Sequence, residues 1–402
     1  MIRGAAMNNT QEKRMKPQKS IKFNIRNYSM VFMLVLIMLV FAVLTDGVNL
    51  NSRNFTNIII QNSYILILAV GMVLVIIVGN IDLSVGSVVA FIGAISAMLY
   101  NSGANMFLTV VLSILVGILV GMFQGMWIAY AKIPAFIVTL AGMMLFRGLT
   151  YIITNVSPIA MKDDNFKQMA SGMVNIDALT IGNVYYTAIV IGALVCIAYI
   201  ISETFSRRNK IKYGFEVSSK NAFISKLVII CACIMGLSQR FATYRGIPAV
   251  VVVLGVTILL FSFLTNNTVI GRYIYAVGGN ARSAKLSGIN SEFVVFMVHV
   301  IMGGLCGLAA IVFTGYMNSA LPQAGVNFEL DAISACFIGG ASTSGGIGTV
   351  MGAIVGGFVM AAINNGMSLK NIAAAWQYVV KALVLLLAVF YDIYTRRKSG
   401  LG

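Results

Sequence analysis

Several polar side chains lie inside long apolar stretches, where they are best placed to do chemistry. Asp82, in the turn Asn80-Ile-Asp-Leu-Ser84, is the leading case, because burying a carboxylate is costly and usually marks a cavity or a pairing partner. The alternative role for Asp82 is structural, as a cap for the following helix with help from Ser84. The groups expected to line a polar path for an uncharged, hydroxyl-rich solute are Asn80, Asp82, Ser84, Gln124, Arg147, Asn364, Asn365, Gln377 and Lys381.

A glycine-rich polar stretch, residues 271–290, separates two apolar runs and has the pattern of a short surface helix. Asn280 is a favourable N-cap, residues 281–287 give about two turns, and Gly288 stands where a left-handed residue ends a helix. A face of small residues there has room to press into a groove of another protein. The predicted contact comprises Gly279, Asn280, Ala281, Arg282, Ala284, Lys285 and Gly288, with Ala281, Ala284 and Gly288 as its small face. A solvated loop is the simpler alternative.

Two carboxylates, Glu329 and Asp331, precede a run of small residues, and we expect them at the outer mouth of the molecule. They are candidates for contact with a soluble partner or for the start of a helix.

Other catalytic chemistry is missing from the sequence. His299 is alone, and the five cysteines lie in apolar runs without CxxC or Cys/His metal spacing, so we interpret them as packing residues. No G-x-x-x-x-G-K-[ST] loop is present, so the chain does not bind a nucleotide through a P-loop of its own. We therefore expect no catalytic residue, no metal site, no cofactor and no enzymatic activity in this chain.

Composition defines the surroundings of these residues. The chain is 59% apolar and only 10% charged, against about 25% charged in soluble globular proteins, which excludes a soluble enzyme. We expect an all-α polytopic membrane protein of about 10–12 transmembrane helices, some of them short or re-entrant. The apolar runs are 28–45, 58–79, 85–100, 106–130, 134–153, 183–201, 227–239, 248–265, 293–315, 332–345, 348–363 and 374–392.

The net charge of +16 is distributed as a topology signal, which argues against a nucleic-acid partner. Basic residues crowd the segment before Tyr28, the loops 203–226 and 267–292, and the C-terminal tail, so we expect these regions and both termini in the cytoplasm. The first apolar run lacks a cleavage site of small residues after it and is interpreted as a retained helix. The expected domains are a tail at 1–27, one transmembrane domain at 28–393 and a tail at 394–402.

Glycine marks two expected breaks, at 79–86 and 344–348, that indicate either a weak parallel repeat beside a transport path or a chance similarity of turns. The segments 227–239, 332–345 and 348–363 are short and are candidates for re-entrant or broken helices. Two ridges of small residues predict close helix packing, namely Gly117, Gly121 and Gly125, and Gly348, Gly352 and Gly356.

Motifs between about residue 45 and residue 392 occur in the order of a known family. They are Leu68-Ala-Val-Gly-Met72, Ile81-Asp-Leu-Ser-Val-Gly-Ser87, 134–143 with Phe146-Arg-Gly148, 271–280, Ala284-Lys-Leu-Ser-Gly-Ile289, Glu329-Leu-Asp-Ala-Ile333, Ile338-Gly-Gly-Ala-Ser342, Asn365-Gly-Met367 and Trp376-Gln-Tyr378. In this combination the chain resembles the permease subunits of bacterial ATP-binding-cassette (ABC) importers for monosaccharides. Among them it is most similar to the xylose and multiple-sugar permeases, because these share the added segments 227–265 and the basic loop 203–226.

The resemblance implies a transport subunit in the bacterial plasma membrane for a xylose-like pentose or a related hexose. It implies a core of two permease copies as a homodimer, cytoplasmic ATPase subunits that hold ATP and Mg²⁺, and an extracytoplasmic sugar-binding protein. Residues 271–290 then correspond to the cytoplasmic coupling region, and Glu329 and Asp331 are candidates for contact with the binding protein. Alternating access would follow from ATP-driven movement of that region.

Other functions remain open. In an ion-coupled secondary transporter, Asp82, Glu329 or Asp331 would carry protons. Importer permeases for nucleosides, branched-chain amino acids or signalling furanoses are further alternatives, and the long docking loop disfavours a channel or a structural scaffold.

Overall fold

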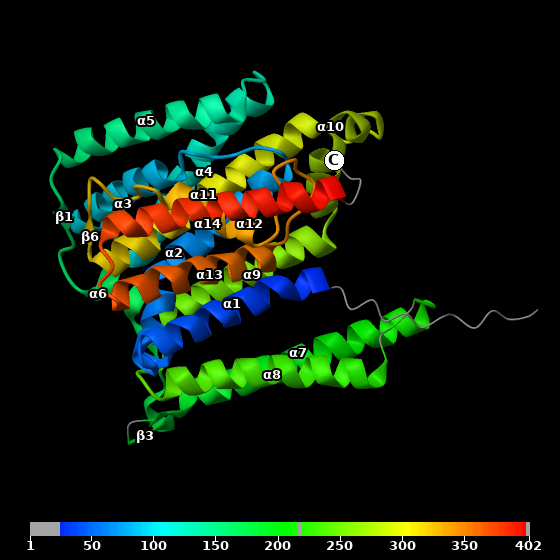
Figure 1. Cartoon of the computed structure of the whole chain (residues 1–402). Helices are drawn as coiled ribbons and strands as arrows, with labels where there is room; N and C mark the ends of the chain where they lie inside the picture. Colours follow the sequence, from blue (N-terminus) through cyan, green and yellow to red (C-terminus); the bar gives the residue numbers. More distant parts are fainter. Residues whose placement is uncertain (1–24, 183, 216, 218, 399–402) are drawn as a thin grey trace, which may run out of the picture.

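A computed structural model describes residues 25–182, 184–215, 217 and 219–398, and this part of the chain is predominantly helical (Figure 1). Most of the predicted basic tails, 1–27 and 394–402, lies outside the described residues. The helix α1 (Ile25–Leu44) begins within the first of these tails, and α14 (Ala374–Lys398) ends within the second.

Length and composition allow eight of the described helices to cross a membrane. They are α2 (Ser52–Ile77), α4 (Met106–Ala129), α5 (Ala135–Thr154), α7 (Tyr186–Lys212), α8 (Lys220–Ala242), α9 (Ala249–Asn267), α11 (Ser291–Met317) and α13 (Val350–Leu369). Three shorter apolar helical segments lie within α1, α3 (Val85–Asn101) and α14. The predicted all-α polytopic membrane fold is confirmed.

The long helices run side by side, so the molecule has two ends (Figure 1). The helix α10 (Val269–Leu286), the connection between α7 and α8, the start of α1 and the end of α14 lie at one end, called here the α10 end. At the other, the β1 end, lie α6 (Asn165–Ser171), β1 (Ile159–Ala160) and β6 (Ser319–Ala320). The basic segments that charge predicts on one side of the membrane therefore share one end, and which side this is remains a prediction.

The core surrounds α2, whose middle residues from Leu66 to Val75 are buried. The neighbours of α2 are α11, α12 (Phe328–Ile338) and α13. The helix α4 packs tightly on α11, because a Cβ atom on Gly117 or Gly121 would overlap the main chain of α11 at Gly303 or His299. The first predicted glycine ridge is thus a close helix contact.

The second glycine ridge packs α13 against the end of α12. A Cβ on Gly352 would overlap the carbonyl of Gly339, and one on Gly356 would overlap the carbonyl of Ala335. Of the three segments predicted to be short, only α12 is short, with 11 residues. The predictions for 227–239 and 348–363 were wrong, because α8 and α13 extend into flanking polar residues and reach 23 and 20 residues.

Short antiparallel strand pairs join neighbouring segments at the β1 end. Ile159 of β1 pairs with Ala320 of β6, and Met173 of β2 (Met173–Val174) pairs with Pro248 of β5 (Ile247–Pro248). A third pair joins β3 (Thr180–Ile181) to β4 (Val184–Tyr185). Two short 3-10 helices, Val48–Leu50 and Asp177–Leu179, complete the described elements. These contacts hold the long connection between α5 and α7 against the bundle.

Candidate coupling site and solute path

The predicted surface helix exists, as the second half of α10. Asn280 has non-helical backbone angles, φ −161° and ψ 98°, and its Oδ1 accepts a hydrogen bond from the backbone N–H of Ser283 at 2.9 Å. Gly288 is left-handed with φ 84°, and the N–H of Ile289 donates to the carbonyl of Ala284 at 3.1 Å. The N-cap and the C-terminal glycine therefore hold the positions that the sequence predicts.

The surface of this helix differs from the expected small face. Ala284 is buried against the bundle, so the face of Ala281, Ala284 and Gly288 is not a continuous free surface, and this part of the prediction is corrected. The side chain of Leu286, which the sequence analysis did not single out, is 86% exposed. Lys285 is held by an ion pair with Glu292 at 2.7 Å.

The first half of α10 meets both glycine breaks at one place, which we call the break junction and define as residues 77–79, 275–279 and 345–348. The N–H of Gly346 donates to the carbonyl of Ile77 at 2.8 Å, so the two breaks touch each other directly. The hydroxyl of Tyr275 donates to the carbonyl of Gly348 at 2.7 Å. A Cβ on Gly278 would overlap the carbonyl of Ile77.

The break junction joins elements that are far apart in sequence. Most of its contacts use backbone atoms, which is why glycine is needed there, whereas Tyr275 contributes its hydroxyl. Both Tyr275 and Gly278 lie in the predicted stretch 271–290, but the spacing of residues did not single them out. The signal that could have revealed this contact is the pair Gly278-Gly279. Each glycine lowers the stability of a helix by about 1 kcal/mol relative to alanine, so a helical pair indicates a compensating close contact. The first half of α10 therefore contacts the chain at both breaks directly.

Asp82 lies in a buried polar cluster between the first break and α4. Its Oδ1 accepts from the backbone N–H of Ser84 at 2.8 Å and from the Ser84 hydroxyl at 2.7 Å. The Gln124 amide donates to Ser84 Oγ at 2.8 Å. The side chain of Thr139 in α5 donates to the Ile81 carbonyl at 3.3 Å. The carboxylate therefore closes a local turn just ahead of α3. The predicted capping role of Asp82 is corrected, because Ser84 holds the N-cap position of α3 and no side chain caps that helix end.

The same cluster is closed to solvent. Asp82, Ser84 and Gln124 are each at most 3% exposed, and Gly142 leaves no room for a Cβ beside the Gln124 amide. His299 of α11 is also buried, with Nδ1 2.8 Å from the Val295 carbonyl and Nε2 without a partner among the described residues. In this conformation the cluster is buried and connects the first break to α4 and α5.

The remaining path candidates are not gathered with Asp82. Asn365 exchanges amide hydrogen bonds of 2.9 Å with Asn54, near the opposite end of α13 from the breaks. Gln377 donates to the Ile372 carbonyl at 3.0 Å. Asn80 is half-buried, and Oδ1 of Asn364 is buried without a hydrogen-bond partner among the described residues. The predicted set therefore divides between the two ends, and the structure shows no single polar path through it.

The predicted outer carboxylates have partners inside the molecule. Asp331 forms an ion pair with Lys381 of α14 at 2.9 Å, with only 16% and 22% of the side chains exposed. Asp331 thus ties α12 to α14, which leaves little of it for a soluble partner. Glu329 is half-buried beside Gly86, while Arg147 donates from Nη1 to the carbonyls of Pro322 and Ala324 and holds the loop before α12.

A hollow of about 370 Å³ opens beside that loop. Its walls include the rings of Phe313 and Phe328 and the exposed amide of Gln323. Tyr64 of α2 packs against both rings, with centroid distances of 4.8 and 4.7 Å. The sequence analysis missed this group, because aromatic residues in apolar helices are indistinguishable from packing residues by spacing alone.

Metal chemistry finds no support in the described part of the chain, which holds no group of three or more His, Cys, Asp or Glu side chains able to bind an ion. Outside the spans, a hydrogen bond from the Tyr100 hydroxyl, at 2.8 Å, lowers the pKa of the Asp163 carboxyl.

The sequence matches a protein family described as the permease component of branched-chain amino acid transport systems over residues 54–389. It is 38% identical over 382 residues to the xylose transport system permease protein of Haemophilus influenzae, covering 93% of this chain and 98% of the relative. It is 37% identical over 377 residues to the protein of that name from Escherichia coli K12, covering 94% of each.

The ribose import permease protein of Haemophilus influenzae is 32% identical over 379 residues, covering 94% of this chain and 96% of the relative. No solved structure matches the chain.

Proposed function

We propose, on the premise that this chain belongs to the family of branched-chain amino acid transport permease components, that it is the membrane subunit of an ATP-driven monosaccharide importer. Relatives named for xylose or ribose transport, at 32–38% identity over nearly the whole chain, support a pentose or a related hexose as the solute. The match to transport permeases and the eight apolar spans make it a multi-pass membrane protein.

The break junction is the observation that carries the proposal. A capped helix with an exposed leucine stands at one end of the molecule, and the preceding turn of that helix touches both interruptions of the transmembrane helices. This is the geometry required of a part that receives movement from outside the membrane and passes it inward. The sequence has no P-loop, which supports placing ATP and Mg²⁺ on a separate ATPase subunit.

The complete importer contains further partners. Two copies of this chain form its core, ATPase subunits bind at the α10 end in the cytoplasm, and a sugar-binding protein docks at the β1 end. The hollow lined by Phe313, Phe328 and Gln323 lies on the side where such a protein would release its sugar. Aromatic faces suit the apolar C–H face of a sugar, and the amide of Gln323 suits its hydroxyl groups.

Two glycines allow a matched test of coupling. Gly278→Ala places a methyl group against the Ile77 carbonyl, whereas Gly255→Ala in α9 meets no atom within 4 Å. In the reconstituted complex we expect Gly278→Ala to lower sugar-stimulated ATP hydrolysis at least fivefold and Gly255→Ala to leave it unchanged. Equal stimulation in both variants would contradict the coupling role of the break junction.

Replacement of Gly288 tests the far end of the same helix. Its left-handed backbone is disfavoured for a β-branched residue by about 1–2 kcal/mol, so Gly288→Val should displace the helix end while the permease stays inserted. We expect lost stimulation of ATP hydrolysis with normal membrane content. An intact response would reject this end as the ATPase contact.

A proton-coupled transporter is the second candidate, favoured by the buried neighbours Asp82 and His299. It predicts uptake that a protonophore abolishes and that removal of the ATPase does not affect. Competition by xylose, ribose and leucine for uptake would separate a sugar permease from one for branched-chain amino acids.

A further inference from the structure

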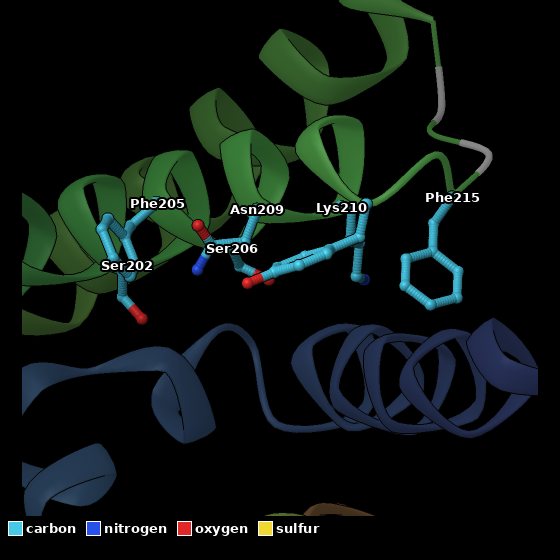
Figure 2. Close-up of a pocket in the computed structure, with 7 residues that line it drawn as sticks. Ser202, Phe205, Ser206, Asn209, Lys210 and Phe215 are labelled. Atoms are coloured by element: carbon cyan, nitrogen blue, oxygen red, sulfur yellow. The ribbon is translucent and has the colours of Figure 1, made fainter.

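The hairpin of α7 and α8 carries a second hollow, remote from the break junction. Its volume is about 370 Å³, and its walls include Ser202, Phe205, Ser206, Asn209, Lys210 and Phe215. Figure 2 shows these side chains on and just beyond the last turns of α7. Hydroxyl, amide and ammonium groups thus line the same hollow as three aromatic rings, those of Phe205, Tyr213 and Phe215.

The depth of this hollow in the membrane follows from the length of α7. The helix has 27 residues and spans about 40 Å, whereas the hydrocarbon core is about 30 Å thick. Its apolar run ends at Ile201, so the hollow begins with the first polar residue after that run. Phe205, Tyr213 and Phe215 are each at least 65% exposed there, as aromatic residues at the membrane interface commonly are.

Charge at the same level is positive and partly unpaired. Within the hairpin, Lys226 forms an ion pair with Glu203 at 2.7 Å, and the Arg207 guanidinium lies 4.6 Å from the centre of the Phe223 ring. No described carboxylate pairs with Lys210 or with its exposed neighbour Arg208. The hairpin packs on the bundle mainly near the β1 end, through Ala188, Phe241 and their neighbours, and its other end is left open.

We propose that this hollow binds the headgroup of an anionic phospholipid. Lys210 holds the phosphate, Ser202, Ser206 and Asn209 supply hydrogen bonds, and Phe205 and Phe215 pack on the glycerol and upper acyl carbons. Juxtamembrane basic residues attract anionic lipids by about 1 kcal/mol each, and basic hollows at this depth suit their headgroups. A second copy of the chain would bring the same positive charge to the contact, which disfavours it as the occupant.

Native mass spectrometry of the purified full chain tests this proposal. Titration with phosphatidylglycerol should give one retained lipid with at least tenfold higher affinity than phosphatidylcholine, and millimolar inorganic phosphate should not displace it. Equal retention of the two lipids would overturn the proposal without reference to any variant. Complete displacement by phosphate would overturn it as well, by identifying a site for soluble anions.

A matched pair of lysine variants locates the lipid. Lys210→Gln should weaken phosphatidylglycerol binding about fivefold, the equivalent of one surface charge. Lys167→Gln, which removes an exposed lysine from α6 at the β1 end, should leave binding unchanged. Unchanged binding in Lys210→Gln, or an equal loss in both variants, would reject the hollow as the lipid site.

Discussion

Single residues in this protein show how a largely apolar bundle holds charge. Asp82 turns its carboxylate to the hydroxyl and the N–H of Ser84, and Asp331 pairs with Lys381. Each charge is satisfied by a partner on a neighbouring turn or helix, which lowers the cost of removing it from water. The buried charges therefore first hold parts of the bundle together. Any role that they have in transport depends on these contacts.

The hydrogen-bonded turn of Asp82 and Ser84 separates two substitutions. Asp82→Ala removes the acceptor for Ser84 and should cost about 1.5–3 kcal/mol of stability. Asp82→Asn keeps an oxygen at Oδ1 and should retain most of the thermal midpoint measured in detergent. Equal midpoints for all three proteins would show that this turn does not contribute to stability.

Uptake by Asp82→Asn tests the charge itself. A contribution of the carboxylate to the solute path predicts a lower uptake rate with unchanged assembly. Wild-type uptake by this variant would leave Asp82 with its structural role alone.

The pair of Lys381 and Asp331 gives a double-mutant cycle. Lys381→Met leaves the mostly buried carboxylate of Asp331 without its partner and should lower the free energy of unfolding by about 3 kcal/mol. This value is the lower limit for a buried ion pair, because both side chains retain some exposure. The double variant Lys381→Met with Asp331→Leu should recover most of the loss. Thermal unfolding measures the stability of the single and the double variant, and Lys370→Met serves as the exposed control. A double variant as unstable as Lys381→Met would contradict the pairing.

Elements are joined in this bundle by backbone contact at glycine. The ridge of α4 lies on α11, the ridge of α13 lies on the end of α12, and α10 lies on the two breaks. Close backbone contact transmits a displacement with little side-chain adjustment, so these glycines define which helices move together.

The α4–α11 contact can be tested by overpacking. Gly121→Ala forces a methyl group against the His299 carbonyl and should cost about 1–3 kcal/mol. Gly148→Ala in α5 meets no atom within 4 Å and should be neutral or slightly stabilising, because alanine favours helices. Thermal midpoints of the two variants decide between them, and a stable Gly121→Ala protein would show that α4 is free to move away from α11.

The sequence predicts a helix, a helix end or a helix contact well where neighbouring residues alone determine it. Apolar runs, the cap at Asn280, the left-handed Gly288 and the first ridge depend on neighbouring residues, and the structure confirms them. Of the second ridge it confirms Gly352 and Gly356, whereas Gly348 lies before α13 and contacts α2. The lengths of α8 and α13 were underestimated because polar residues at their ends prolong them. The meeting of 77–79 with 345–348 was not predictable from spacing, since it depends on how helices far apart in sequence assemble.

The whole molecule is a bundle of long helices with two different ends (Figure 1). Its basic segments and α10 share one end, while the aromatic hollow and the strand pairs share the other. Glu329 and Asp331 lie in the first turn of α12, as the helix-start alternative predicts, but the sequence gave no sign that Asp331 is held by Lys381. Similarly, the polar path candidates were chosen by type, and only three-dimensional packing divides them between the two ends.

Transport by the complete assembly tests the central claim most directly. The permease, its ATPase and its binding protein are reconstituted in liposomes, and uptake of labelled xylose and ribose is measured with ATP on the ATPase side. The account predicts uptake of at least one sugar that requires ATP, is insensitive to a protonophore and falls at least fivefold in Gly278→Ala but not in Gly255→Ala. Sugar uptake by the permease alone, driven by a proton gradient and equal in both variants, would contradict it.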